Sequence, residues 1–403
     1  MRPPRFLLAL VAGALVSGCV TAPRSWRVTV APADADRAGV VVAFPLPAGA
    51  PRNLALTGAG GTLPVQVDAD GTARFVVAAI KAGESPAFTL APTPVLALAG
   101  AVQAEVTNDR VRFGVHGSPY LDYWTSPEPL PNDKIDRAYL RSGHIHPLFT
   151  PSGRLVSSSY PLQHLHHHGI WTPWTKTKFQ GREPDFWNMG KRTGTVEFEH
   201  LDRAWSGPVH GGFVARHRHV DLSAPSPVVA LHETWVVTLF HVPGAARPVR
   251  VFDLESTMAC ATNDALILPQ YHYGGMGYRG NELWFGKDKA FILTSEGETD
   301  RVKANHQRMR WCHVGGDVDG QRTGVAVLGH PANFRAPQPV RIHPNEPYIS
   351  FVAQQLGEFA IEPGRPYVAR FRFVVMDGPP DAALLEAYWQ AYAHPAVARV
   401  EAL

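Results

Sequence analysis

The feature that most constrains the fold is a set of short runs in which apolar and polar residues alternate. In residues 367–375, apolar side chains take every second position, beginning with Tyr367. Because successive side chains of a strand point to opposite faces, this pattern predicts a half-buried β-strand. Gly320 separates two further runs, 311–313 and 324–328, and marks a hairpin between them. Similar runs occupy 228–240, 249–258 and 283–293. With 36 glycines and 36 prolines between such runs, the chain is predicted to be all-β with sandwich architecture.

The runs divide into two predicted units and one helix. A small N-terminal β-domain is expected over 27–95, ending in the Pro/Ala-rich segment APTPVLALAG. One large antiparallel assembly is expected over 101–378 and would carry the functional site. In 379–403, Asp381 is a suitable N-cap for the helix DAALLEAYWQAYAHP. We expect the apolar stripe of this helix to pack on the large unit.

The first 19 residues have the pattern of a lipoprotein signal peptide. Arg2 and Arg5 precede an apolar run at 6–16 that is shorter than the roughly 20 residues a membrane span needs. The run ends in Val-Ser-Gly-Cys, which resembles a lipobox with Cys19 as the lipidated residue. No aspartate follows Cys19, a pattern similar to that of outer-membrane lipoproteins. We expect a chain anchored in a Gram-negative envelope by lipid alone, with an ordinary secretory signal as the alternative.

Charge and cysteine content exclude some classes of partner and site. The formal charge is +3 over 403 residues and no basic run is present, so nucleic acid is not an expected partner. Besides Cys19 the chain has Cys260 and Cys312, and no Cys-x-x-Cys spacing. A thiolate zinc site is therefore not expected. The two cysteines could form a disulfide, but two separate buried thiols are the preferred interpretation.

The densest polar feature is QHLHHHGIW, residues 163–171. Six of the 19 histidines lie between 144 and 168, including the pair in SGHIHPLF. If 163–171 is extended, His164, His166 and His168 share one face and His167 lies on the other. Imidazoles in this pattern could line a functional cleft, bind a divalent metal through His164 and His166, or be ordinary edge-strand residues bonded to carbonyls and water.

Other segments could join the same cleft. QYHYGGMGYRG, residues 270–280, interleaves aromatic and basic residues with glycines that would let a ligand approach the backbone. EPDFWNMGKR contributes Asp185, Trp187 and Lys191, and LHETW contributes Glu233. Glu233 could instead be an ordinary strand residue that faces outward. Indole faces beside polar groups, as at Trp171, Trp174 and Trp187, are typical of sugar sites and equally of protein cores.

Three ordered segments resemble a bacterial domain-of-unknown-function family labelled "methane oxygenase PmoA". PLQHLHHHGIW is similar to its DHPHHRG-[LI]-W signature, YHYGGMGYRG to its YGGMGLR block, and GHPANFRAPQPVRIH to its HPxNxRxPxPW block. The resemblance covers most of the chain, including LPVQVDADG near the N-terminus. The positions that carry over are His164, His166, His167, Gly274, Gly275, Arg279, His330, Asn333 and Arg335. Gln163, Leu165 and His168 depart from the pattern, so the aspartate of an Asp–His pair and a clamping arginine are missing there.

The resemblance implies a fold and a class of ligand. It implies a β-supersandwich related to galactose mutarotases, in a family whose members accompany sugar oxidoreductases and glycan-degrading proteins. A carbohydrate ligand is therefore the expected partner. Fold-level analogy alone does not establish the reaction.

The leading hypothesis is an envelope lipoprotein that performs histidine-based acid–base chemistry on a glycoside or an oxidised keto sugar, by elimination, hydrolysis or epimerisation. His166 or His167 would be the base or acid, with His164 and His272 as partners or metal ligands. Arg279 would stabilise an anion and Tyr273 would protonate a leaving oxygen. The expected substrate-binding residues are Trp171, Trp187, Asp185, His330, Asn333 and Arg335. The alternatives are a non-catalytic glycan-binding lipoprotein and a metal-dependent redox protein.

Overall fold

The computed structural model describes residues 25–93 and 102–403. The predicted signal peptide and Cys19 lie outside the described residues. In the described part, every pair of neighbouring strands within the sheets runs antiparallel. The alternating runs at 228–240 and 249–258 form β15 (Val228–Phe240) and β16 (Val249–Cys260). The all-β prediction is therefore confirmed.

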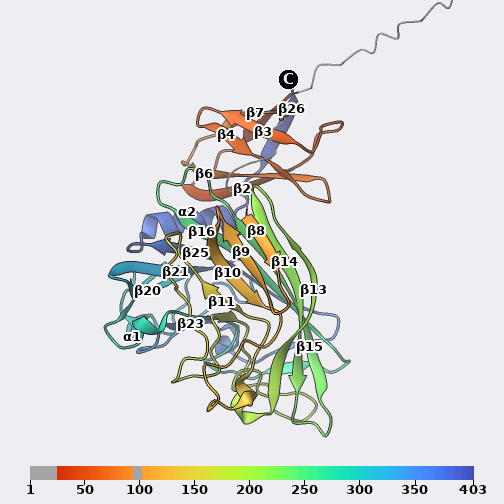
Figure 1. Ribbon diagram of the computed structural model, residues 1–403, viewed down its shortest axis with the longest axis vertical. Helices are drawn as coiled ribbons and strands as arrows, with labels where there is room; N and C mark the ends of the chain where they lie inside the picture. Colours follow the sequence, from red (N-terminus) through yellow and green to blue (C-terminus); the bar gives the residue numbers. More distant parts are fainter. Residues whose placement is uncertain (1–24, 94–101) are drawn as a thin grey trace, which may run out of the picture.

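The N-terminal strands and the last strand of the chain form two small sheets. The five-stranded sheet has the order β26 (Ala398–Ala402), β1 (Trp26–Val30), β7 (Ala87–Pro92), β3 (Leu54–Gly58) and β4 (Gly61–Pro64). The three-stranded sheet has the order β2 (Arg37–Pro45), β6 (Thr72–Ile80) and β5 (Gln66–Val67). Figure 1 shows these strands at one end of the molecule, above the large sheets.

Two eight-stranded sheets make up most of the protein. One has the order β22 (Val340–Ile342), β23 (Tyr348–Phe351), β18 (Met276–Arg279), β12 (Ile170–Trp171), β11 (Ile145–Leu148), β10 (Ser118–Trp124), β9 (Arg110–Val115) and β8 (Val102–Val106). The other has the order β13 (Gly194–Trp205), β14 (His210–Asp221), β15, β16, β25 (Tyr367–Asp377), β21 (Gln321–Gly329), β20 (Trp311–Val318) and β19 (Ala290–Thr294). The predicted hairpin at Gly320 is the β20–β21 connection.

The main hydrophobic core lies between these two sheets, because the alternating runs of each sheet turn their apolar side chains inward. Phe252 of β16 and Phe373 of β25 stack with ring centroids 4.6 Å apart and are fully buried. Phe113 of β9 meets Phe213 of β14 across the layers, at 5.8 Å. Each buried phenylalanine contributes about 1.5–3 kcal/mol. Sandwich packing thus sets the frame on which the loops are held.

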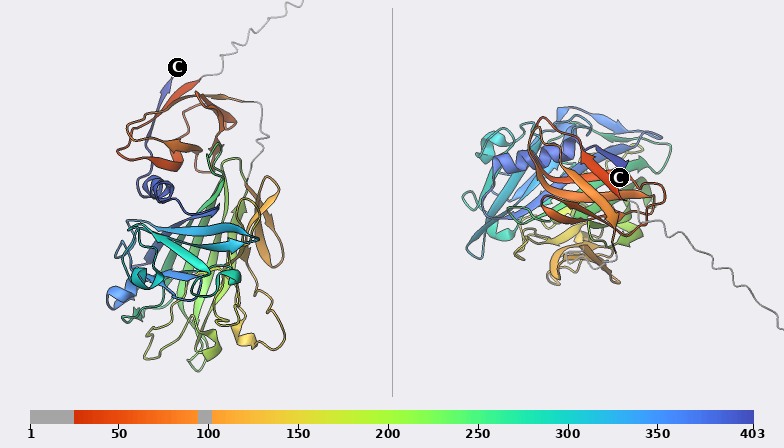
Figure 2. Two further views of the ribbon diagram at one scale, coloured as in Figure 1. Left: turned by 90° about the vertical axis from the view of Figure 1, so that its left-hand side faces the viewer. Right: turned by 90° about the horizontal axis from the view of Figure 1, so that it is seen from above.

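The C-terminal helix forms as expected, but the end of the chain does not stay on the large sheets. Asp381 caps α2 (Ala382–Ala393) by accepting a hydrogen bond from the Leu384 amide at 3.0 Å. The helix lies between the small and large sheets (Figure 2), and buried Tyr388 packs over Gly39 of β2. The chain then forms β26, which pairs with β1. The helix itself packs against the large unit through Leu385 and Tyr388. The prediction for 379–403 did not include β26, which completes the first sheet.

The remaining elements are short. They are β17 (Leu266–Leu268) paired with β24 (Phe359–Ile361), α1 (Arg301–Ala304), η1 (Arg137–Tyr139), η2 (Met189–Lys191), η3 (Glu282–Trp284) and η4 (Ala353–Leu356). The alternating run predicted at 283–293 is a strand only in β19, because η3 and a turn occupy its first half. Among the described residues, no helix has the length and apolar character that crossing a membrane would need.

Candidate functional site

A half-open pocket of about 220 Å³ lies beside the histidine segment. Four segments build it: residues 161–169 before β12, 172–193 after β12, 269–275 before β18, and 343–347 between β22 and β23. These strands are neighbours in one sheet, with Ile170 opposite Tyr278 and Arg279 opposite Tyr348. The pocket is lined by His164, His166, His167, Thr175, Trp187, Asn188, Tyr271, Tyr273, His343 and Tyr348. The histidine segment and the tyrosine loop thus face a common hollow.

The histidine segment is a pair of consecutive turns, so the face-sharing considered for an extended chain does not apply to it. The His164 amide donates to the Pro161 carbonyl and the His167 amide to the His164 carbonyl, both at 2.9 Å. The turns gather the rings of His164, His166 and His167 on the pocket side, with centroids 4.9–5.5 Å apart. His168 lies on the other side, against His144.

Gly169 allows the segment to return to the sheet. Its φ is +41°, and an added Cβ would lie 2.0 Å from the Ile145 carbonyl oxygen. No L side chain fits at that distance, so the close approach of the turn to β11 requires glycine here.

One wall of the pocket is aromatic. Trp171, Trp187 and Tyr348 form a small buried cluster, with Tyr273 packed against it. Trp187 and Tyr348 line the pocket, whereas Trp171 is fully buried behind His167. The wall therefore presents flat apolar rings beside imidazole nitrogens, the combination that sugar rings require.

Asp185 supports this wall from behind and does not line the pocket. Its Oδ1 accepts hydrogen bonds from the amides of Trp187 and Asn188, and its Oδ2 contacts Lys191 at 2.9 Å. With its oxygens occupied and the residue buried, Asp185 positions Trp187. Its predicted direct contact with substrate is therefore corrected.

A chain of charged groups runs from the pocket into the protein. His164 Nδ1 lies 2.7 Å from Oε1 of Glu346, and the other oxygen of Glu346 contacts the Arg279 guanidinium. Arg279 also contacts Glu282 at 2.8 Å and lies 3.4 Å from His167 Nδ1. Burial alone would raise the pKa of Glu346, but His164 and the Arg279 charge lower it to about 2. Glu346 is thus a carboxylate at neutral pH, paired with the exposed imidazole.

Arg279 itself is fully buried, so the expectation that it stabilises an anion in the pocket is corrected. Two carboxylates compensate its charge, and its place is behind His167 and Glu346. It can influence a ligand only through the residues that it holds.

Other imidazoles of the pocket are neutral at physiological pH. Burial, the larger effect, and the nearby His164, the smaller one, lower the pKa of His166 to about 4. Burial also lowers the pKa of His343 to about 4 and that of His167 well below its ordinary value. A neutral imidazole can donate one hydrogen bond and accept another, which suits hydroxyl or carbonyl groups of a ligand.

Tyr273 brings a hydroxyl to the other side of the pocket. Its oxygen accepts a hydrogen bond from Arg341 at 3.0 Å, which leaves the phenol proton free to point elsewhere. His272, by contrast, is not among the lining residues; its ring lies against Tyr271 and His306. The predicted pairing of His272 with the histidine segment is not present.

The loop bearing His330, Asn333 and Arg335 lies away from this pocket. His330 and Asn333 line a separate cavity of about 210 Å³ near α2, and Asn333 exchanges two hydrogen bonds with the Arg370 backbone. Arg335 donates to the carbonyls of Ala353, Gly357 and Glu358. These side chains tie loops together, so the expectation that they bind the same substrate is corrected.

Sequence reasoning missed Glu346, His343 and Tyr348, all in IHPNEPY at 342–348. No motif spacing singles out this loop; only its charged and aromatic residues between prolines set it apart. Glu233 was also misjudged: it is fully buried between the sheets, where His219, Trp235 and Ser256 contact its carboxylate.

The geometry does not favour His164 and His166 as metal ligands. In the described part of the chain, the group whose ligand atoms all lie within 4.8 Å of one another is Glu128, His144 and His168. Cys260 and Cys312 are both free thiols, Cys312 buried and Cys260 partly so. The interpretation as two separate thiols is confirmed, apart from the partial exposure of Cys260.

Comparisons with known proteins give a family and distant structural matches. The description "Family of unknown function (DUF6807)" matches residues 110–390. No curated protein matches the chain. Two solved structures from Enterococcus faecalis are similar: an alpha-mannosidase (TM-score 0.46, 11% identity, 94% of this chain and 46% of that one) and a protein in glycosyl hydrolase family 38 (TM-score 0.41, 10% identity, 94% and 47%). The chain thus spans about half the length of these structures.

The family match covers all the residues that line the pocket and the strands of the two large sheets from β9 to β25. It confirms the predicted resemblance to a domain-of-unknown-function family. The methane-oxygenase label and the relation to galactose mutarotases stay predictions. The chain is a member of the DUF6807 family of unknown function.

Proposed function

We propose that this pocket is the active site of a carbohydrate-active enzyme that moves protons on an oxidised sugar. The observation that carries the proposal is the 2.7 Å contact between His164 and Glu346 at the mouth of an aromatic-walled pocket. A carboxylate this close to one imidazole nitrogen stabilises the imidazolium that forms when the other nitrogen takes a proton. The volume, about 220 Å³, is below the range of about 300–1,000 Å³ usual for drug-sized ligands, which favours a single ring.

The roles follow from what each group can do. His164 Nε2 would accept the proton from the carbon next to the sugar carbonyl, and the C–H electron pair would form the carbon–carbon double bond. The bond to the glycosidic oxygen would break, and Tyr273 would protonate the leaving oxygen. Neutral His166 would donate a hydrogen bond to the enolate-like oxygen while it carries charge. Trp187 would hold the apolar face of the ring.

Turnover of 3-keto and ordinary glycosides by the purified full-length protein tests this proposal. His164→Asn is expected to reduce kcat/KM on the keto substrate by at least about 100-fold, the usual contribution of a general base. His200→Asn, at a surface histidine whose side chain is 67% exposed, is the matched control and should retain activity. Equal turnover by the wild type and His164→Asn would remove His164 from the mechanism.

A non-catalytic glycan-binding protein is the second candidate, favoured by the aromatic wall. His164→Asn and a further variant, Trp187→Ala, separate it from the enzyme when sugar binding is measured beside turnover. A binding protein shows saturable binding without turnover, which survives His164→Asn and is lost in Trp187→Ala. Product formation by the wild type excludes this reading.

We infer further that lipid at Cys19 anchors the chain in a Gram-negative envelope. Support comes from the Val-Ser-Gly-Cys lipobox after the apolar run 6–16. A diacylglyceryl group inserts by burying many CH2 groups at about 0.8 kcal/mol each. In a Gram-negative host, the wild type is expected in the membrane fraction with a lipid mass increment, and Cys19→Ser without one. An unmodified Cys19 in the membrane fraction would refute the anchor.

A further inference from the structure

A second cluster of ionisable groups lies behind the pocket wall, and the proposed function does not use it. Glu128 comes from the loop after β10, His144 from the residue before β11, and His168 from the end of the histidine segment. One ligand atom from each lies within 4.8 Å of the others, and His144 Nε2 is 2.8 Å from Glu128 Oε2. His144 and His168 are fully buried.

Two imidazoles and a carboxylate form a donor set that suits zinc and neighbouring divalent metals. Hydrogen bonds within the protein do not satisfy every polar atom of this donor set. His144 Nδ1 and His168 Nε2 are buried without a hydrogen-bond partner. Most buried polar atoms in native proteins have a partner, or an ion or water that takes its place.

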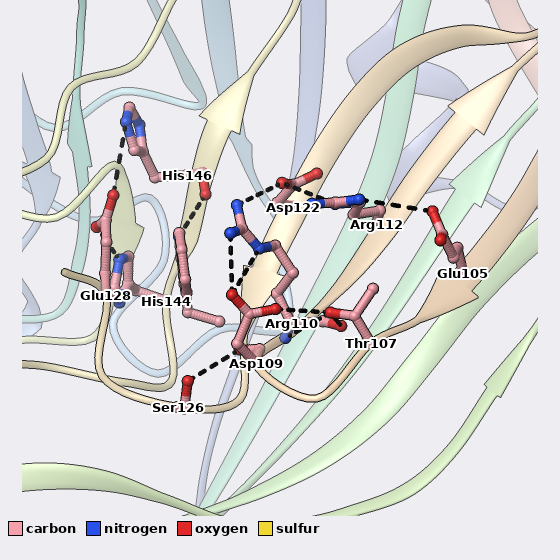
Figure 3. A network of polar contacts seen from close by, with 11 residues as sticks. Glu105, Thr107, Asp109, Arg110, Arg112, Asp122, Ser126, Glu128, His144 and His146 are labelled. Carbon is pink, nitrogen blue, oxygen red and sulfur yellow. Dashed lines mark hydrogen bonds and ion pairs between the residues drawn. The ribbon is translucent and has the colours of Figure 1, made fainter.

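The surroundings resemble the outer shell of a metal site. The Ser159 hydroxyl donates to Glu128 Oε2 at 2.5 Å and lies 3.3 Å from His168 Nδ1, so it orients the carboxylate. Figure 3 shows the Glu128 carboxylate between the rings of His144 and His146. His146 Nε2 is 4.0 Å from Glu128 Oε1, and its Nδ1 is 2.8 Å from the Ser157 hydroxyl.

Of the four side chains, those of Glu128 and His146 are the ones with some solvent exposure. Their side chains are 13% and 16% exposed, whereas the other two histidines are closed off. A bound ion would therefore have protein on most sides and solvent on one. That arrangement leaves a coordination position for water or for His146 after a small movement.

We propose that Glu128, His144 and His168 bind one late first-row divalent cation of the zinc type. The ion joins three segments that the sequence separates, and it holds the end of the histidine turns against the sheet. His168 directly follows His167, which lines the pocket. A bound ion would therefore stabilise the wall of the pocket from behind.

Zinc binding by the full-length protein tests this proposal independently of any sugar activity. The protein is stripped with a chelator, reconstituted with Zn2+, and titrated against a chromophoric competitor, with bound zinc measured by elemental analysis. The wild type is expected to bind one Zn2+ per chain at sub-micromolar concentration and to gain thermal stability. A stripped wild type that binds no Zn2+ overturns the proposal without reference to any variant.

Variants then locate the ion. Glu128→Gln and His168→Gln are expected to weaken zinc binding at least about 100-fold, and Ser159→Ala by about 10–100-fold as an outer-shell change. His166→Gln, a neighbouring histidine that faces the pocket, is the matched control and should bind zinc as the wild type does. Loss of zinc in His166→Gln with retention in His168→Gln would place the ion in the pocket and refute the site. Ser159→Ala removes no proposed ligand and gives a readout if a ligand variant fails to fold.

Discussion

Glu346→Gln is expected to reduce turnover by about 10²–10⁴-fold and to destabilise the fold by about 3–5 kcal/mol. The substitution removes the negative charge that pairs with His164, so the imidazolium formed during proton transfer loses its stabilising partner. It also leaves the buried Arg279 with Glu282 as its remaining carboxylate contact. Turnover on the keto substrate and urea unfolding of the same preparation measure the two effects separately.

The control for Glu346→Gln is the same substitution at Glu362, which pairs with Arg365 on the surface. Exposed pairs contribute about 0–1 kcal/mol, so Glu362→Gln should leave both quantities nearly unchanged. If Glu346→Gln behaves like this control, the buried pair neither stabilises the fold nor takes part in catalysis. A stability loss with full turnover would make Glu346 a structural residue only.

The pH dependence of stability follows from the same carboxylate. The pKa of Glu346 is about 2 in the folded protein, against an ordinary value of 4.5. The resulting stabilisation is present above pH 4.5 and is lost as the pH falls toward 2. Glu346→Gln lacks a titrating carboxylate, so its stability should fall less than that of the wild type over this window.

Glu233→Gln is expected to destabilise the protein by about 3–5 kcal/mol with no direct effect on the pocket. Glu233 is fully buried between the large sheets and accepts hydrogen bonds from Thr172, Trp235 and Ser256, with His219 Nε2 at 2.9 Å. A glutamine amide would turn an NH2 group toward one of these donors. Urea unfolding measures the change.

Glu255→Gln is the matched control for Glu233→Gln. Glu255 is on the neighbouring strand β16, and its carboxylate pairs with Arg370. The side chains of Glu255 and Arg370 are 42% and 35% exposed, so this pair is close to solvent. Glu255→Gln should lower the free energy of unfolding by less than about 1 kcal/mol. Equal unfolding midpoints for the two variants would show that the buried network contributes no more than a surface pair.

The elements that the sequence predicted well are those in which local pattern and burial agree. The alternation in 367–375 became β25, and Asp381 caps α2. Period-two alternation and a capping carboxylate act between residues of one strand or one turn, so the sequence reveals them without knowledge of tertiary contacts. The end of the chain was predicted less well, because the pairing of β26 with β1 joins residues far apart in the sequence, such as Trp26 and Ala402.

The histidine segment shows where local reasoning fails. An extended chain would have placed His168 on the same face as His164 and His166. Two turns form instead, with hydrogen bonds to the carbonyls of Pro161 and His164. They direct His167 toward the pocket and His168 away from it. Four histidines in five positions carry little strand or turn preference of their own, so the contacts of Gly169 with β11 decide the geometry.

From the sequence alone, the β-class and the family resemblance could be determined, because each depends on pattern along the chain. The grouping of the histidines with the tyrosine–glycine loop was an expectation, because it depends on contacts between segments about 100 residues apart. Only the tertiary structure brought Glu346 to His164. Gln163 stands where the family pattern has the aspartate of an Asp–His pair, and antiparallel pairing of β18 with β23 brings a carboxylate from 182 residues further along the chain than His164. Charge pairs of this kind depend on distance in space, which strand pairing sets and sequence spacing does not reveal.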